Sequence, residues 1–99
     1  MTPGPTLYLV SYDICDKKRL RKVHKIMVGR GDRVQYSVYR CALSELQLAT
    51  LESVLIEVIK PTEDQVLIVP LGAADAPRSW KMYALGKPLV PPERVVRIV

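Results

Sequence analysis

The sequence of 99 residues contains no phenylalanine, a single tryptophan, a single histidine and two cysteines. It has no apolar run approaching the ~20 residues that a membrane-spanning helix requires. Without Phe and without a basic-Gly-aromatic motif, it lacks the signature of RNA-binding domains that stack bases on a sheet. It also has neither a Ser/His/Asp arrangement nor a phosphate-cradling glycine loop, which argues against both of those kinds of site.

The cysteines and the N-terminus bear on the cellular location. Cys15 and Cys41 have no Cys or His partner at metal-ligand spacing, so they do not indicate a zinc site. The N-terminus has no basic region ahead of its short apolar stretch, so we expect no secretory signal and no membrane association. We therefore expect a cytoplasmic protein with both thiols reduced.

The composition is that of one ordinary globular domain. Hydrophobic residues make up 48% of the chain, and a chain of this length can bury roughly 60–70% of its unfolded surface without staples. We expect a single domain over residues 1–99, with its core at about 6–72 and a C-terminal segment at about 73–99.

The net charge of +5 is unevenly distributed along the chain. Residues 1–41 carry nine basic and three acidic side chains, a net of +6. Residues 42–76 carry one basic and six acidic side chains (−5), and residues 77–99 carry five basic and one acidic (+4). Clustered positive charge is typical of proteins that bind a phosphate backbone, and it is equally typical of a solvated helix face on a basic protein. Charge alone leaves both interpretations open.

The apolar stretch at residues 7–12 predicts a buried strand that ends at Asp13. Alternation places Leu7, Leu9, Ser11 and Asp13 on one face, and Tyr8, Val10 and Tyr12 on the other. A carboxylate at the end of a buried strand is costly to desolvate unless a cation meets it. A helix rich in Lys and Arg follows immediately.

This first helix is expected over residues 17–29, with Asp16 as its N-cap and Gly29 at its C-terminal end. A period of about 100° per residue places an apolar stripe of Leu20, Val23 and Met27 on one side, with Ile26 at its margin. The opposite side is basic and carries Lys17, Lys18, Arg21, Lys22 and Lys25. His24 borders the stripe and is interpreted as a packing residue without a catalytic role. Arg19 lies between the two sides and can reach back toward the strand end.

The remaining pattern predicts a β-α-β(-β)-α-β order, in which the second β element is either one strand or two. Residues 33–41 are β-rich, and Gln35-Tyr36-Ser37 has no hairpin-turn chemistry, so periodicity favours one long or bulged strand there. A capping box at residues 44–47 opens a second helix that ends near Ile59. Residues 65–71 are almost continuously apolar, which is typical of a strand buried on both faces. Weaker patterns predict an extended segment at 80–85, a turn at 86–88 and a short strand at 95–99.

This order suits an α+β fold with an antiparallel sheet and both helices on one face. The other sheet face, which carries Leu7 and Leu9, then needs a cover, and self-association supplies one. The terminal strand could add to the sheet edge of a partner.

Asp13 is the candidate ligand for a divalent cation. Mg²⁺ commonly binds one or two carboxylates and completes its octahedron with water and substrate phosphate. If two uncovered faces meet across a two-fold axis, two Asp13 side chains could hold one ion, which would polarise a phosphoryl oxygen or activate water. Arg19, Arg21 and Arg33 offer forked donors for phosphate.

Two tyrosines could complete this site, and two others are expected in the core. Tyr12 and Tyr39 could stack a base or orient the backbone. Tyr8 and Tyr36 are interpreted as core residues. Asp16 is interpreted as a helix cap rather than a second metal ligand.

Four blocks of sequence follow one another along the chain: Tyr12-Asp13-Ile14 with Asp16, then Lys18-Arg19-Leu20-Arg21-Lys22-Val23, then Gly31-x-Arg33-Val34-Gln35-Tyr36-Ser37-Val38-Tyr39, and last Val66-Leu67-Ile68-Val69-Pro70-Leu71. In this order and at this spacing they resemble the CRISPR-associated protein 2 family, whose members are the small partners of the CRISPR spacer integrase. The resemblance extends from residue 7 to about residue 72.

The resemblance implies a ferredoxin-like fold, a homodimer formed through the sheet faces, and a C-terminal strand that pairs with the other subunit. It also implies that residues 33–41 form two short strands with a tight turn near Tyr36. By position it implies Asp13 as the Mg²⁺ ligand, and it implies active-site or phosphate-contacting roles for a further set: Tyr12, Arg19, Arg21, Arg33 and Tyr39. Tyr39 occupies a position where family members often carry Phe.

Three functions follow as alternatives. The first is an Mg²⁺-dependent endonuclease, acting on RNA or DNA in spacer acquisition. The second is a DNA-binding scaffold of the integrase complex without catalysis of its own, in which the basic helix carries duplex DNA through Lys17, Lys18, Lys22 and Lys25. The third is a related toxin-like ribonuclease that would share the fold and the strand-end Asp. Genomic context beside an integrase gene and a repeat array would separate the last from the others.

Overall fold

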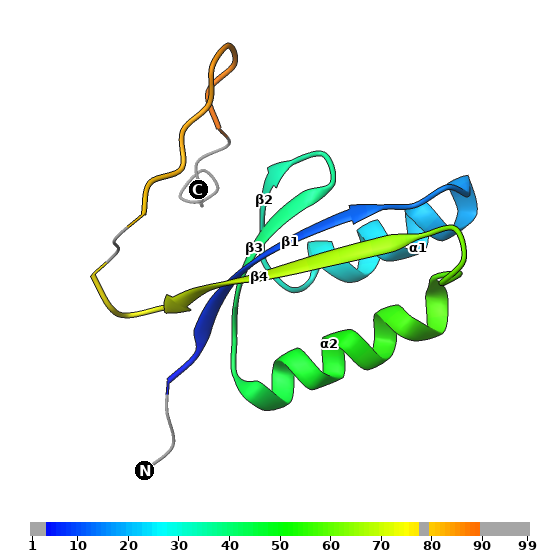
Figure 1. Cartoon of the computed structure of the whole chain (residues 1–99), viewed down its shortest axis with the longest axis horizontal. Coiled ribbons are helices and arrows are strands. Elements are labelled where there is room, and N and C mark those ends of the chain that lie inside the picture. The colour runs from blue at the N-terminus through cyan, green and yellow to red at the C-terminus, as the bar shows by residue number, and fades with distance from the viewer. Residues whose placement is uncertain (1–3, 78–79, 90–99) are drawn as a thin grey trace.

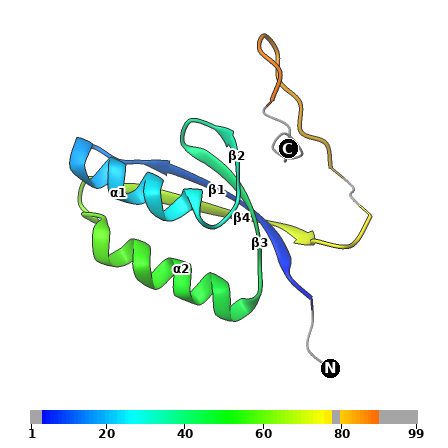
Figure 2. The same cartoon turned by 180° about the vertical axis from the view of Figure 1, so that it is seen from behind.

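A computed structural model of the protein describes residues 4–77 and 80–89. The elements follow the order β1 (Thr6–Asp13), α1 (Lys17–Val28), β2 (Asp32–Gln35), β3 (Val38–Leu43), α2 (Glu45–Val58) and β4 (Gln65–Ala73). The four strands form one antiparallel sheet in the order β2-β3-β1-β4. Figures 1 and 2 show both helices on the same face of this sheet. The expected α+β fold, with its βαββαβ order, is therefore confirmed.

Local capping explains where the two helices begin. The Asp16 side chain accepts a hydrogen bond from the backbone N–H of Arg19, as expected for an N-cap. Ser44 and Gln47 form the predicted capping box at the start of α2, with both reciprocal hydrogen bonds present. The C-cap of the first helix is Gly29, and that of the second is Ile59, directly before Lys60-Pro61.

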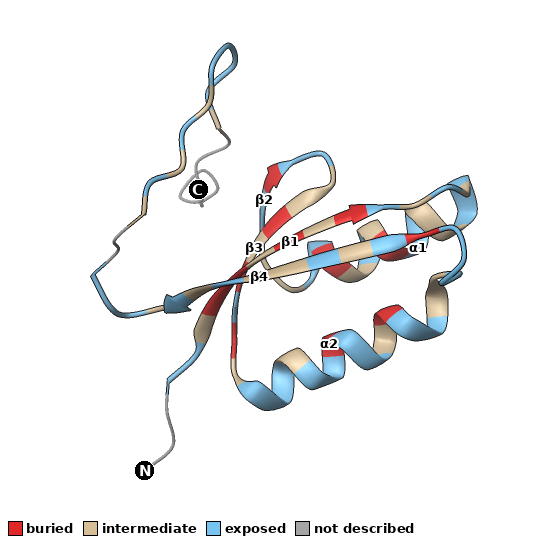
Figure 3. Cartoon of the chain, viewed as in Figure 1, coloured by how far each residue is buried: buried red, intermediate tan, exposed pale blue. Residues whose placement is uncertain are grey.

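The core lies between the helices and the face of the sheet that they cover. Buried residues of the central strands are coloured red in Figure 3, and the main contributors are Tyr8, Val10 and Tyr12 from β1 with Tyr39, Cys41 and Leu43 from β3. The helices contribute Val23 and Met27 from α1, and Leu51 and Leu55 from α2. The predicted faces of β1 and the apolar stripe of α1 are thus confirmed, with Leu20 and Ile26 packed at the margin of the core.

The segment at residues 33–41 is a hairpin, so the single long strand favoured by periodicity is wrong. Strands β2 and β3 are joined by a turn at Tyr36 and Ser37, and their register shifts between Arg33 and Gln35. The register shift changes which side chains share a face of the sheet. The alternation of apolar and polar residues along the sequence therefore does not reveal the turn. The two-strand arrangement implied by the family resemblance is confirmed. Tyr36, expected in the core, is instead 62% exposed on this turn.

Residues 65–71 are expected to form a strand buried on both faces, but within a single chain β4 is an edge strand whose outer face is exposed. None of its residues is fully buried, and Leu67 is 55% exposed. Its continuous apolar sequence has a different origin: Val66 and Ile68 pack against the core, whereas the alternate side chains lie on the uncovered face. On that face, register sets Leu9 opposite Val69.

The segment after β4 carries no regular strand within its described part. Residues 80–84 form no strand, and Gly86 adopts a left-handed φ of 87°, consistent with the predicted turn. Trp80 donates from Nε1 to the carbonyl oxygen of Leu71 at 3.1 Å. The strand expected at 95–99 lies outside the described residues. Within the described ranges, no helix is long and apolar enough to cross a bilayer.

Candidate functional site at the end of strand β1

Asp13 is the last residue of β1 and projects from the uncovered face of the sheet. It pairs in register with Gln65 of β4 and is exposed. Its carboxylate forms no hydrogen bond or ion pair with any residue in the described ranges. Exposure removes the desolvation cost that a buried strand end would impose. The carboxylate is therefore available for a ligand.

Among the described residues, the potential metal ligands of one chain fit Mg²⁺ better than zinc or calcium. In residues 4–77 and 80–89, no three His, Cys, Asp or Glu side chains group closely enough to hold a metal ion. A structural zinc or calcium cage needs more protein ligands than Asp13 alone. Mg²⁺ needs only one or two carboxylates, with water and phosphate filling its other positions. Asp13 therefore fits a magnesium site, in which water and phosphate supply the other ligands.

Asp16 acts as the N-cap of α1. Its side chain caps α1, and the hydrogen bond from the Arg19 backbone N–H lowers the pKa of this carboxyl below its ordinary value. The interpretation as a helix cap is confirmed.

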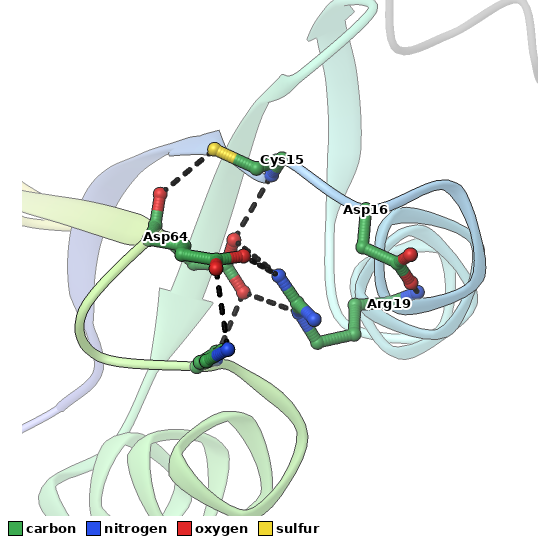
Figure 4. Close-up of polar contacts among 6 residues, drawn as sticks. Cys15, Asp16, Arg19 and Asp64 are labelled. Atoms are coloured by element: carbon green, nitrogen blue, oxygen red, sulfur yellow. Dashed lines mark hydrogen bonds and ion pairs between the residues drawn. The ribbon is translucent and has the colours of Figure 1, made fainter.

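The loop before β4 places a third carboxylate, Asp64, opposite Arg19 of α1 and next to Cys15 (Figure 4). Its side chain is fully buried. Oδ1 accepts hydrogen bonds from the backbone N–H of Cys15 at 2.9 Å and from Arg19 Nη2 at 3.2 Å, and Oδ2 accepts from Arg19 Nε at 2.7 Å and from the backbone N–H of Lys60 at 2.8 Å. Arg19 Nη2 also contacts Glu63 Oε1 at 3.0 Å. We call these five residues the Asp64 cluster.

The Asp64 cluster is satisfied in charge and in hydrogen bonding. The Arg19 guanidinium holds the pKa of the Asp64 carboxyl well below its usual range, and the same contact raises the pKa of Arg19. The cluster joins the residues directly after Asp13 to both ends of the α2–β4 loop. It therefore fixes the direction in which the chain leaves β1.

Arg19 is consequently held by carboxylates rather than projecting toward a substrate. The sequence allowed it to reach back toward the strand end, and it does so, but its guanidinium binds Asp64 and Glu63. We interpret Arg19 as a residue that positions the strand end. Its phosphate-contacting role, which the family resemblance implied, stays a prediction.

Tyr12 and Tyr39 lie in the core, so their expected availability for base stacking is wrong. They are 4% and 1% exposed, and their rings stack on each other with centroids 6.3 Å apart. Both hydroxyl groups approach Nδ1 of His24, at 3.0 Å from Tyr12 and 3.4 Å from Tyr39. Burial raises the pKa of Tyr12 to about 12 and also raises that of Tyr39. Their face of the sheet is covered by α1, which excludes a base.

His24 connects these buried hydroxyls to the surface, a role that sequence reasoning missed. Its ring is half-buried and stacks on that of Tyr36, with centroids 5.9 Å apart and planes 22° apart. A histidine beside an apolar stripe is the ordinary signal of packing, and only the arrangement of Tyr12, Tyr36 and Tyr39 around it indicates more.

The other basic candidates remain exposed. Arg33 lies on β2 with its Cζ 5.4 Å from the ring centroid of Tyr36. The outer side of α1 carries the expected exposed cations, Lys17, Lys18, Arg21, Lys22 and Lys25. No ion pair within the described part of the chain involves any of these side chains.

Comparison with known proteins agrees with this architecture. Residues 6–78 match the family described as CRISPR associated protein Cas2. A protein from Geobacter sulfurreducens named CRISPR-associated endoribonuclease Cas2 is 38% identical over 93 residues, which cover 94% of this chain and 97% of that protein. One from Rhodospirillum rubrum, named CRISPR-associated endoribonuclease Cas2 1, is 38% identical over 93% of this chain and 89% of its own length.

Two crystal structures are similar in fold as well as in sequence. The hypothetical protein TT1823 from Thermus thermophilus matches with a TM-score of 0.75 and 31% identity, over 89% of this chain and 99% of that one. Streptococcus pyogenes Cas2 matches with a TM-score of 0.63 and 32% identity, over 67% of this chain and 86% of that one.

Proposed function

The chain belongs to the CRISPR associated protein Cas2 family, and from that premise we propose that it is an Mg²⁺-dependent endonuclease that acts as a homodimer in CRISPR spacer acquisition, with the integrase subunit as its partner. The curated relatives are named endoribonucleases. The observation that carries the proposal is the exposed carboxylate of Asp13 on the uncovered face of the sheet, which has no hydrogen-bond or ion-pair partner among the described residues.

Support for the homodimer comes from the side chains on that face. Cross-strand pairs put Leu9 beside Val69, and Ser11 between Val38 and Leu67. These apolar side chains are half-buried or exposed, with Leu67 at 55% exposure. Exposed apolar side chains gathered on one sheet face, here interspersed with Ser11 and Arg40, are usually covered by a partner, and a second copy of the same face is self-complementary across a two-fold axis. The segment at about 73–99 would extend this contact beyond the core at 6–72.

The same geometry accounts for a metal site. Since Asp13 shares the face with the apolar patch, a two-fold axis through the patch would bring two Asp13 carboxylates to the same interface. These two residues would hold Mg²⁺, which when bound polarises a phosphoryl oxygen or activates water. Arg21 and Arg33 would bind and orient the phosphate backbone. The Asp64 cluster would keep each Asp13 at a fixed position.

Removal of the metal tests the proposal. Purified protein is expected to cleave single-stranded RNA or DNA in the presence of Mg²⁺, to stop when EDTA is added, and to recover when Mg²⁺ is returned in excess. Cleavage products resolved on denaturing gels provide the measurement. Cleavage that continues unchanged in EDTA, after dialysis against chelating resin, would contradict the requirement for a metal.

A second function, a scaffold for duplex DNA, is favoured by the basic side of α1. Two lysines, Lys17 and Lys18, occupy the first turn of the helix, which contains no acidic residue. Cations there oppose the helix dipole and cost a few tenths of a kcal/mol to about 1 kcal/mol each. An anionic partner such as phosphate would offset this cost. The two functions are compatible, because cleavage would depend on Asp13, whereas the scaffold would depend on four lysines of the helix: Lys17, Lys18, Lys22 and Lys25.

Charge reversal tests the scaffold function. Lys17→Glu, Lys18→Glu and Lys22→Glu combined are expected to weaken duplex binding at least tenfold and to reduce the dependence of affinity on salt, because fewer counterions are released. Fluorescence anisotropy at several salt concentrations measures both. Reversal of Lys81 and Lys87, which lie outside the helix, is the matched control. An affinity for duplex DNA that changes neither with the triple charge reversal nor with the salt concentration would overturn the scaffold function.

A further inference from the structure

A groove between α1 and the β2–β3 turn has a volume of about 430 Å³. We call it the aromatic groove, and its lining residues are Leu20, Arg21, His24, Lys25, Val28 and Tyr36. Its volume lies in the range of roughly 300–1,000 Å³ that small-molecule sites occupy. We propose that the aromatic groove binds an unpaired nucleobase of a single-stranded nucleic acid.

The lining offers a surface for a flat apolar ring. Tyr36 is 62% exposed and its ring lies almost parallel to that of His24, 5.9 Å away between centroids. Val28 is 58% exposed on the neighbouring helix. Aromatic rings exposed in this way form stacking surfaces for bases, and they tolerate any base because every base has a π face.

The charges around the groove select a nucleotide over other flat ligands. Arg21 and Lys25 line the groove, Arg33 lies over the Tyr36 ring, and the lining includes no acidic residue. An apolar peptide would leave these cations without partners, and a small anion would leave the apolar surface bare. A nucleotide joins a ring to a phosphate and so satisfies both parts of the lining.

His24 provides a hydrogen-bond donor toward the base. Its Nδ1 faces the hydroxyls of Tyr12 and Tyr39. The nearer of the two, the Tyr12 hydroxyl, lies 3.0 Å from Nδ1 and can donate its proton to this nitrogen. We therefore assign the ring proton of His24 to Nε2. Among the described residues Nε2 has no hydrogen-bond partner, so it can donate to a carbonyl oxygen or ring nitrogen of a base.

The groove lies at the same end of the sheet as Asp13. The carbonyl oxygen of Ser37, next to Tyr36 in the turn, accepts a hydrogen bond from the backbone N–H of Tyr12 at 3.1 Å. A base held in the groove would thus bring its backbone toward the strand end. A base within a duplex is stacked and paired, so it cannot enter without being extruded. The inference rests on the proposed nucleic-acid binding and adds that the bound strand is unpaired at this position.

Binding of a single-stranded oligouridylate of about twelve nucleotides tests the inference without requiring cleavage. With Ca²⁺ or EDTA in place of Mg²⁺, Tyr36→Ala is expected to weaken binding about 5- to 100-fold, the loss expected for one stacked base. Tyr36→Phe retains the ring and is expected to bind within about twofold of wild type. Tyr83→Ala, which removes a tyrosine 81% exposed outside the groove, is the matched control and is expected to bind as wild type does.

A second readout does not depend on the stability of the variants. In NMR spectra of the wild-type protein, the His24 Cε1–H resonance is expected to shift on addition of uridine monophosphate and to stay in place with ribose 5-phosphate, which has the phosphate but no base. Equal shifts with the two ligands, or equal affinity of wild type and Tyr36→Ala for the oligonucleotide, would overturn the base site. Loss of all nucleic-acid binding by the wild type would instead contradict the proposed function, so the two failures are distinguishable.

Discussion

Asp64→Ala is expected to lower the melting temperature by roughly 15 °C. A shift of this size is expected in a domain of this length when one member of a buried ion pair is removed and the other charge is left without its partner. The Asp64 side chain is fully buried and accepts four hydrogen bonds, two of them from the Arg19 guanidinium. Its removal leaves that guanidinium with Glu63 alone and leaves the backbone N–H groups of Cys15 and Lys60 without acceptors. Thermal unfolding followed by circular dichroism is the measurement.

The dependence of this effect on pH has a defined sign. The folded-state pKa of Asp64 lies below its ordinary value of 3.8, and that of Glu63 is lowered too. A carboxyl group whose pKa is lowered in the folded state stabilises the protein at pH values above its unfolded-state pKa. This stabilisation is lost as the pH falls from the unfolded-state pKa through the folded-state pKa. The difference between wild type and Asp64→Ala is therefore expected to be full at pH 7 and to narrow below about pH 4.

Asp75→Ala, which removes an exposed carboxylate, is the control for Asp64→Ala and is expected to change the melting temperature by no more than a degree or two. If Asp64→Ala melts within two degrees of wild type at pH 7, the Asp64 cluster does not hold the strand end.

The second large effect concerns cleavage rather than stability. Asp13→Asn is expected to reduce Mg²⁺-dependent cleavage at least about 100-fold, because it removes the charge that holds the ion, and loss of a ligand exceeds the 10- to 100-fold typical of outer-shell changes. Since Asp13 is exposed and has no protein partner in the described residues, the melting temperature is expected to stay within a few degrees of wild type. Initial rates under saturating Mg²⁺ provide the measurement.

Asp75→Asn, purified identically, is the matched control for a contaminating nuclease and is expected to cleave as wild type does. Equal cleavage by Asp13→Asn and wild type would remove Asp13 from the site and would attribute the activity to a contaminant.

Most of the fold could be predicted because its signals are local. Asp16 and Ser44 cap helices through bonds to residues only three positions away. The stripe through Val23 and Met27 repeats at helical spacing, and the alternation of β1 is regular. The predictions that were wrong concern segments whose local sequence pattern fits more than one structure. The apolar run of β4 resembles a buried strand although it lies at a sheet edge, and a register shift conceals the β2–β3 turn.

The candidate site was only partly predictable, because its contacts are distant in sequence. Asp13 was identified from its place at a strand end. Asp64 had no such signal, since its partner Arg19 is 45 positions away and the pairing depends on the path of the α2–β4 loop. Tyr12 and Tyr39 carry residue types suited to stacking, but the side of the sheet that α1 covers decides that they are buried. Tyr36 is exposed because it lies on a turn that alternation does not reveal.

The most direct test of the paired Asp13 site is a mixing experiment. Wild type and Asp13→Asn are unfolded together in equal amounts, refolded so that subunits combine at random, and assayed for Mg²⁺-dependent cleavage. If one ion requires the carboxylates of both subunits, only dimers with two wild-type chains are active, and about one quarter of the wild-type activity is expected. Retention of about one half would mean that each subunit acts alone, and it would contradict a site shared across the dimer axis.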